Sequence, residues 1–271
     1  MAPSPLISVD ELSEALRGPK PPVLLDVRWS LQQPDGSEAY RSGHLPGAVY
    51  VSLDTELSNF ADEPTEGRHP LPTTAVLQAS ARSWGVNDGD ELVVYDDVSG
   101  PAAARAWWLL RRNGVRTVRV LDGGLQAWIT AGGRLEEGEV RPTSGTVTLV
   151  PTPEVAPAIN RDAVPGYAAS GMLVDVRAPE RFSGESEPVD PVAGHIEGAV
   201  NLPMSHLTRD GGMAEPGLVR AELERLGVDL EGEVALYCGS GVTAAGAALA
   251  LESAGVRAVV YPPSWSGWIA E

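Results

Sequence analysis

Short apolar runs rich in β-branched residues alternate along the chain with longer segments of helical periodicity. In the first half, the pattern predicts strands at residues 23–27, 49–51, 91–95 and 117–121, and helices at residues 9–16, 73–84, 102–113 and 124–131. In the second half, a strand at 234–237 and helices near 160–170, 217–226 and 243–254 repeat the alternation. This spacing is typical of α/β domains with a mainly parallel sheet flanked by helices.

The chain also carries two copies of one pattern. Four blocks recur in the same order: Asp-Val-Arg ending at Arg28 and Arg177, Gly-His-x-x-Gly-Ala-Val around His44 and His195, a strand end at Asp96 and Cys238, and a Trp-containing block ending at Trp128 and Trp268. The copies are domain-sized, whereas a solenoid repeats over a far shorter period. With the proline-rich stretch read as a linker, the order predicts a domain at 1–143, a linker at 144–158 and a second domain at 159–271.

Composition narrows the class of protein. The chain of 271 residues is 43% hydrophobic and 21% charged, with a formal net charge of −17 and scattered acidic residues. We therefore expect a globular protein that binds neither nucleic acid nor an anionic membrane surface. No apolar run long enough for a membrane span is present, and the N-terminal segment lacks the features of a signal peptide. A single cysteine fits a reducing cytosol, so we expect a cytoplasmic location.

That cysteine, Cys238, lies in Tyr-Cys-Gly-Ser-Gly-Val-Thr-Ala, between the strand at 234–237 and the helix at 243–254. Backbone N–H groups and the positive end of a helix dipole both favour an anion at such a turn. A sulfur placed there should ionise readily, and the thiolate is the nucleophilic form. The alternative is a buried structural cysteine. The first copy has Asp96 at this position, and a carboxylate cannot perform thiolate chemistry. The first domain is therefore expected to be catalytically silent.

These blocks resemble the two-domain rhodanese family of sulfurtransferases over essentially the whole chain. The resemblance implies two tandem rhodanese-like domains and a loop cysteine that takes a sulfane sulfur, holds it as a persulfide and passes it to a nucleophile. The loop form is similar to that of the 3-mercaptopyruvate sulfurtransferases. It therefore implies that Cys238, Ser240, His69 and Asp54 act in catalysis and that Arg181, Gly239, Gly241, Val242 and Thr243 bind the substrate anion.

Each assignment has a plain structural alternative. His69 also fits a surface loop, Asp54 an N-cap or turn, and Arg181 a surface salt bridge. Related mercaptopyruvate enzymes usually carry a second arginine after Glu-Pro, where this chain has Val189. A second departure is Tyr-Pro-Pro-Ser at 261–264, where the family usually has Asp-Gly before Ser-Trp.

The resulting expectation is a sulfurtransferase that uses 3-mercaptopyruvate, without a metal or an organic cofactor. The alternatives are a thiosulfate:cyanide sulfurtransferase and a sulfur-carrier or binding module fed by a partner protein. Cyanide, small thiols or thioredoxin are the expected acceptors. A cysteine-dependent phosphatase is disfavoured, because the sixth residue after Cys238 is Ala244 and not the arginine that would bind phosphate. The Asp-Val-Arg pairs, His44 and His195 are expected to be structural.

Overall fold

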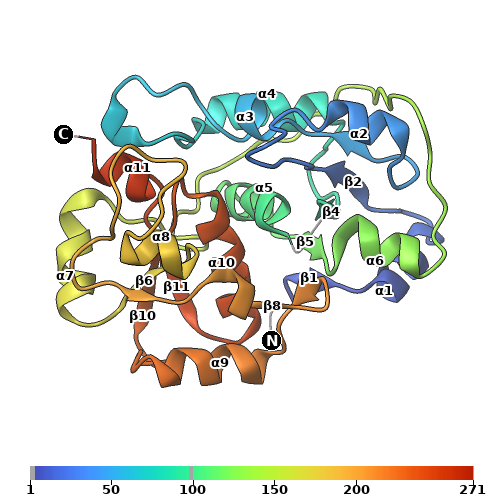
Figure 1. Cartoon of the computed structure of the whole chain (residues 1–271). Helices are drawn as coiled ribbons and strands as arrows, with labels where there is room; N and C mark the ends of the chain where they lie inside the picture. Colours follow the sequence, from blue (N-terminus) through green and yellow to red (C-terminus); the bar gives the residue numbers. More distant parts are fainter. Residues whose placement is uncertain (1–3, 98–99, 271) are drawn as a thin grey trace. The chain divides into compact units, whose positions relative to one another are not determined.

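The computed structural model describes residues 4–97 and 100–270 and divides into two compact units (Figure 1). Unit 1 comprises Met1–Asn59, Leu71–Ala156 and Asp210–Gly212, and unit 2 comprises Phe60–Pro70, Pro157–Arg209 and Met213–Glu271. The short segment Phe60–Pro70 therefore belongs to the unit that carries Cys238, although it lies far from it in the sequence.

Unit 1 is built on a five-stranded sheet in the order β1-β5-β4-β2-β3, in which every pairing is parallel. Its strands are β1 (Leu6–Ile7), β2 (Val23–Asp26), β3 (Val49–Tyr50), β4 (Leu92–Tyr95) and β5 (Val118–Leu121). Its helices are α1 (Val9–Leu16), α2 (Ser37–Ser42), α3 (Leu53–Glu56), α4 (Thr74–Ser83), α5 (Pro101–Arg112) and α6 (Gly124–Thr130). The parallel sheet and the helices that flank it confirm the α/β fold expected from the periodicity.

Local sequence explains where these helices begin. Ser8 and Glu11 form a capping box at the start of α1, and the Thr73 hydroxyl caps α4. Helix α5 begins with Pro101, which suits the first turn because proline lacks the N–H that would be left without a partner there. The apolar faces of α1 and α6 close over the sheet in a core that includes Leu12, Leu24, Val93, Leu125 and Trp128.

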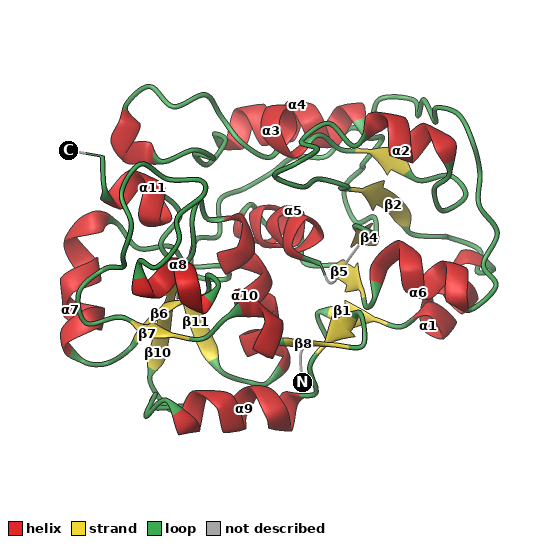
Figure 2. Ribbon diagram, in the orientation of Figure 1, coloured by secondary structure: helices red, strands yellow, loops and turns green. Residues whose placement is uncertain are grey.

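Unit 2 repeats the design with a four-stranded parallel sheet in the order β11-β10-β6-β7. Its strands are β6 (Leu173–Asp175), β7 (Val200–Asn201), β10 (Glu233–Tyr237) and β11 (Arg257–Val260), and β8 (Thr208–Arg209) pairs with β9 (Gly212–Met213) separately. Helices α7 (Val164–Ala169), α8 (Pro179–Ser183), α9 (Pro216–Arg225), α10 (Val242–Ser253) and α11 (Ser264–Trp268) accompany the strands, with single 3₁₀ turns at Pro64–Glu66, Arg161–Ala163 and Met204–His206 (Figure 2). Strand β10 leads directly into the Cys238 loop and α10 leads away from it.

The stretch expected to act as a linker is hydrogen-bonded along unit 1. The Gly145 N–H donates to the Arg82 carbonyl at 2.8 Å, and the Thr152 N–H donates to the Arg112 carbonyl at 2.7 Å. Its prolines prevent it from forming regular structure, but the amides of residues 145–150 and 152 find partners on unit 1. The change from unit 1 to unit 2 falls between Ala156 and Pro157.

Within residues 4–97 and 100–270, no helix combines the length and the apolar character that crossing a bilayer requires.

Candidate active site

The two Asp-Val-Arg blocks are structural, as expected. Arg177 forms an ion pair with Asp175 at 2.6 Å and donates to the Gly194 carbonyl at 2.7 Å. In unit 1, Arg28 makes the same pair with Asp26 at 2.7 Å and reaches the Gly43 carbonyl. Burial lowers the pKa of Arg177, but the hydrogen bond and charge of the adjacent Asp175 raise it further, so the net pKa lies above its ordinary value. Each arginine therefore stays charged and fixes a strand end to a neighbouring loop.

Cys238 follows β10 at the carboxyl end of the sheet, where ligands bind in open α/β folds. Gly241 adopts φ +83°, which bends the loop so that its N–H donates to the Cys238 Sγ at 3.1 Å. This is the one hydrogen bond to that sulfur within the described residues, although the sequence predicted that several amides would converge on it. Val242 and Thr243 open helix α10, so their amides belong to its first turn. Cys238 is 3% exposed, and a hydrogen-bonded sulfur in this position differs from one packed only among hydrocarbon.

Hydrogen bonds to a residue that follows β11 also hold the Cys238 loop in place. The Cys238 N–H donates to the Ser264 hydroxyl at 3.1 Å, and this hydroxyl donates to the Tyr261 carbonyl at 3.0 Å. Ser264 is fully buried with φ +52°, a backbone conformation that is costly for a residue with a side chain. Its hydrogen bonds to the loop explain why the strain is tolerated.

Unit 1 has a carboxylate at the matching point. Asp96 follows β4, is 4% exposed, and accepts hydrogen bonds from the N–H groups of Gly100 at 3.0 Å, Ala102 at 3.1 Å and Ala103 at 3.2 Å. These amides lie at the start of α5. The loop of unit 1 is therefore an anion site filled by the protein's own side chain.

The segment Phe60–Pro70 brings two side chains to the Cys238 loop. The His69 Nδ1 lies 2.8 Å from the Ser240 Oγ, and the hydrogen bond joins residues that the sequence had predicted to act together. The Arg68 N–H donates to the Ser266 hydroxyl at 3.1 Å. A Cβ on Gly67 would lie 2.5 Å from the Pro263 carbonyl oxygen, so the segment packs tightly on the loop before α11.

Asp54 lies in unit 1, in the first turn of α3, and it is exposed. Its carboxylate accepts a hydrogen bond from the Trp29 indole N–H at 3.0 Å. The turn position agrees with the structural alternative, and the catalytic role of Asp54 stays a prediction.

Arg181 belongs to a cluster of charged residues whose two carboxylate side chains are buried and whose arginines are partly exposed. Its Nε and Nη2 atoms bind the Glu187 carboxylate at 2.8–3.0 Å, and Nη2 also lies 2.9 Å from the Asp190 Oδ2. The other Asp190 oxygen pairs with Arg68. Burial raises the pKa of Glu187, but hydrogen bonds from Arg181 and from the amides of Asp190 and Val189 outweigh it, so the net pKa is lowered. The cluster therefore pairs the carboxylates of Glu187 and Asp190 with the guanidinium groups of Arg181 and Arg68.

Sequence reasoning missed Arg68 and Asp190. The available signal was their position in the sequence: Arg68 precedes His69, and Asp190 follows Val189, where the family usually has an arginine. Only the fold brings them together, because they lie 122 positions apart.

The histidines outside the loop have structural contacts, as expected. The His44 ring stacks on Tyr40 with 4.1 Å between centroids, and the His195 ring stacks on Phe182 at 3.9 Å. Among the residues that the structure describes, no group of His, Cys, Asp or Glu side chains is arranged to hold a metal ion.

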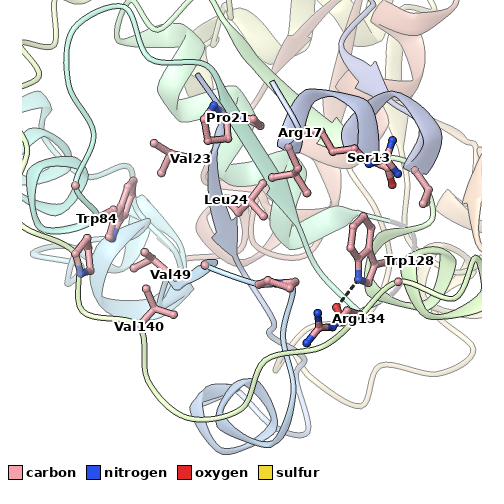
Figure 3. A pocket seen from close by; sticks show the side chains of 18 of the residues that line it. Ser13, Arg17, Pro21, Val23, Leu24, Val49, Trp84, Trp128, Arg134 and Val140 are labelled. Atoms are coloured by element: carbon pink, nitrogen blue, oxygen red, sulfur yellow. Dashed lines mark hydrogen bonds between the residues drawn. The ribbon is translucent and has the colours of Figure 1, made fainter. Parts of the chain in front are cut away.

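A separate hollow lies entirely within unit 1 (Figure 3). Its volume is about 860 Å³, and its walls include Val23 and Val49 at the starts of β2 and β3, together with Trp84 and Trp128. It therefore lies at the amino ends of the strands, whereas Asp96 and Cys238 follow the carboxyl ends of theirs. The Trp128 indole N–H donates to the Arg134 carbonyl at 2.9 Å, so this wall is already hydrogen-bonded.

Comparison with known proteins agrees with this architecture. The rhodanese-like domain family matches residues 8–131 and 158–271. The chain is 47% identical to the Mycobacterium tuberculosis protein named "Putative thiosulfate sulfurtransferase SseB" over 265 residues, covering 97% of this chain and 93% of that protein. It is 32% identical to the 3-mercaptopyruvate sulfurtransferase of Escherichia coli over 267 residues, covering 97% and 94% of the two chains.

Solved structures give the same result. The crystal structure of SseA from Escherichia coli, which has the rhodanese fold, superposes with a TM-score of 0.84 at 31% identity and covers 97% of this chain and 99% of that chain. The duplicated blocks, the two parallel sheets and the matches to both halves lead to one conclusion: this chain belongs to the rhodanese-like domain family and contains two copies of the domain.

Proposed function

We propose that the protein is a sulfurtransferase that moves a sulfane sulfur from 3-mercaptopyruvate to a thiophilic acceptor through a persulfide on Cys238. The observation that carries this proposal is the Cys238 loop itself. It holds a thiol at a strand end, with a backbone N–H on the sulfur at 3.1 Å and a hydrogen-bonded Ser240–His69 pair beside it. Relatives named as sulfurtransferases support the same activity.

In the first half-reaction, the Cys238 thiolate attacks the sulfur of the donor. The new S–S bond forms as the donor C–S bond breaks, and the electron pair of that bond leaves as the enolate of pyruvate. The proton of the donor thiol then passes to the enolate carbon, which gives pyruvate and the persulfide anion. Backbone N–H groups at the start of α10 suit the negative charge of the outer sulfur.

Ser240 and His69 are suited to move that proton. Their side chains are within hydrogen-bond distance, and Ser240 lies two residues after the nucleophile. An adjacent hydroxyl and imidazole can pass a proton from the donor thiol to the departing carbon. Asp54 remains a predicted third member of this relay.

In the second half-reaction, a nucleophile removes the outer sulfur and restores the Cys238 thiolate. Cyanide would leave as thiocyanate, and a small thiol would leave as its own persulfide. Thioredoxin is a further proposed acceptor, because its active-site thiolate is a nucleophile of the same kind. We also propose a cytoplasmic location, on the ground that a single thiol fits a reducing compartment.

Thiosulfate is the second candidate donor. The M. tuberculosis relative, at 47% identity, is named for this substrate. With thiosulfate the same attack would release sulfite, which keeps the electron pair of the broken S–S bond. The persulfide that forms on Cys238 is identical.

The intact mass of the protein tests the proposal. After incubation with mercaptopyruvate and removal of the excess, the protein should gain the mass of one sulfur atom and lose it when cyanide is added. Cys238→Ser should show no gain. A gain in Cys238→Ser, or none in the unaltered protein with either donor, would refute the proposal. Initial rates with the two donors in parallel then decide which one is preferred.

A further inference from the structure

Two guanidinium groups converge on the residue that follows Cys238. A Cβ placed on Gly239 would lie 3.0 Å from the Arg68 Nη2, 3.5 Å from the Arg181 Nη2 and 3.6 Å from the Arg181 Nη1. Gly239 itself is buried, and the absence of a side chain there relieves what would be a tight contact with the Arg68 Nη2. The two arginines come from different segments of unit 2, Phe60–Pro70 and helix α8.

Asp190 fixes the two arginines relative to each other. One of its carboxylate oxygens pairs with the Arg68 Nη1 and the other lies 2.9 Å from the Arg181 Nη2. The Asp190 side chain is 1% exposed, and its N–H is held by the Glu187 carboxylate at 3.0 Å. A buried carboxylate that accepts hydrogen bonds from two arginines gives both a defined orientation.

This arrangement leaves donor nitrogens of both arginines without a hydrogen-bond partner among the described residues. Within residues 4–97 and 100–270, the Arg68 Nη2 and the Arg181 Nη1 make no hydrogen bond, and both lie beside Gly239. The Arg68 side chain is 32% exposed and that of Arg181 is 15% exposed, so this pair of N–H groups is within reach of solvent. The two oxygens of one carboxylate can each accept a hydrogen bond from the N–H group of a different arginine.

We propose that Arg68 and Arg181 together bind the acid group of the sulfur donor, and that Arg68 supplies the guanidinium that is absent at Val189. This inference rests on the proposed function and assigns a substrate contact to a residue that the sequence pattern does not single out. Because Asp190 and Glu187 offset the two positive charges, the cluster is close to neutral. It therefore favours a donor with one acid group and one negative charge, such as mercaptopyruvate.

The decisive comparison uses a donor that lacks the acid group. Mercaptoacetone carries a methyl group where mercaptopyruvate has its carboxylate, and its C–S bond breaks in the same way. In Arg68→Met, we expect kcat/KM for persulfide formation from mercaptopyruvate to fall about ten- to a hundredfold, the usual effect of losing a charge-assisted hydrogen bond. The rate with mercaptoacetone should change by less than about twofold, and the loss should lie mainly in KM.

Matched variants separate binding from folding. Arg68→Lys should keep part of the preference for the acid donor, because it keeps the charge but not the planar geometry. Arg225→Met removes an exposed arginine from α9, and it should leave both rates unchanged. A fall in Arg68→Met that is equal for the two donors, or no fall with either, would overturn the proposal.

Binding without turnover distinguishes failure of this proposal from failure of the proposed function. In Cys238→Ser, titration calorimetry with pyruvate should detect binding that weakens at least tenfold when Arg68→Met is added. If the unaltered protein forms no persulfide but this difference is found, the proposed function fails and the arginine site stands. If persulfide forms normally and Arg68→Met binds pyruvate as well as its parent, only the arginine site fails.

Discussion

The two units place different residues at the same point of the same fold, and the contrast explains what the loop is for. In unit 1, Asp96 directly follows β4, and its carboxylate accepts hydrogen bonds from three backbone N–H groups near the start of α5. In unit 2, Cys238 directly follows β10, and its sulfur accepts a hydrogen bond from the N–H of Gly241, the residue before α10. The backbone around both is alike: Leu125 donates its N–H to the Asp96 carbonyl, and Trp265 donates its N–H to the Cys238 carbonyl.

The contrast indicates that the loop stabilises negative charge whichever side chain it holds. In unit 1 the hydrogen-bond acceptor is permanent, because the Asp96 carboxylate is part of the protein. In unit 2 the smaller Cys238 side chain accepts a hydrogen bond from one amide. In the proposed function, the amides of the loop would also stabilise the charge of a transferred sulfur. The arginine pair beside Gly239 and the His69–Ser240 pair are found in unit 2, so this unit also has groups that can bind and process a donor.

Placing the aspartate of the unit 1 loop at the position of Cys238 gives the largest expected effect. Cys238→Asp should abolish sulfur transfer, since it removes the nucleophile. It should nevertheless be at least as stable as the neutral Cys238→Asn, because the loop would accept a carboxylate as unit 1 does. Chemical denaturation of the two variants at neutral pH makes the comparison. A Cys238→Asp variant that is several kcal/mol less stable than Cys238→Asn would show that the loop is not an anion site.

Glu187 sharpens the contrast between the two Asp-Val-Arg blocks, because it adds a second buried carboxylate, 3.3 Å from Arg177, to the block of unit 2. Glu187→Gln should cost about 3 kcal/mol at pH 7, as expected when one member of a buried ion pair is removed. Since the pKa of Glu187 is lowered in the folded protein, its contribution is complete above its ordinary pKa of 4.5 and is lost as the pH falls through the lower folded value.

Denaturation curves of the unaltered protein and of Glu187→Gln across pH 3–7 test this sign. The difference in unfolding free energy should shrink toward acid pH. A difference that grows as the pH falls would contradict the direction assigned to the pKa.

Asp96 tests the anion site of unit 1. Asp96→Ala leaves three buried N–H groups without their acceptor, and it should cost about 2 kcal/mol in unfolding free energy. The neighbouring Asp97→Ala should cost less than about 0.5 kcal/mol. Sulfur transfer per folded molecule should be unchanged in both. Loss of transfer in a folded Asp96→Ala protein would mean that unit 1 is not catalytically silent.

Two glycines provide the finest comparison. Gly241 has φ +83° and Gly100 has φ +84°, each directly before the long helix of its unit. Replacement by alanine should cost about 1 kcal/mol at Gly100, because an L side chain is strained there, and more at Gly241, where the new Cβ would also clash with backbone atoms. Only Gly241→Ala should also slow persulfide formation, since its Cβ would lie 2.4 Å from the Pro262 carbonyl oxygen. If Gly241→Ala and Gly100→Ala form the persulfide at the same rate, the backbone geometry at Gly241 does not contribute to the reaction.

Much of the fold follows from the sequence pattern. Helix α1 begins and ends where the periodicity predicts, and β2, β4, β5 and α10 differ from prediction by a residue or two at their ends. The signals are strong because α1 has a clear capping box and the others contain continuous runs of apolar residues. The two-residue strand β1 and the short helices α2, α3 and α8 were not predicted. Segments of that length carry too few residues for a period to appear, and their structure depends on tertiary contacts.

The site was only partly predictable, for a different reason. Cys238 and Ser240 stand in one local motif, so the sequence places them together. The attachment of Phe60–Pro70 to unit 2 depends on contacts such as Gly67 with Pro263, which no local pattern encodes. The role of Arg68 therefore became visible only in three dimensions.

The central claim is that the Cys238 loop stabilises a persulfide anion. A crystal structure of the protein after reaction with mercaptopyruvate tests it most directly. The account predicts an additional sulfur on Cys238 that accepts hydrogen bonds from two or more backbone N–H groups of residues 239–243. An additional sulfur that points away from these amides, with none within hydrogen-bond distance, would contradict it.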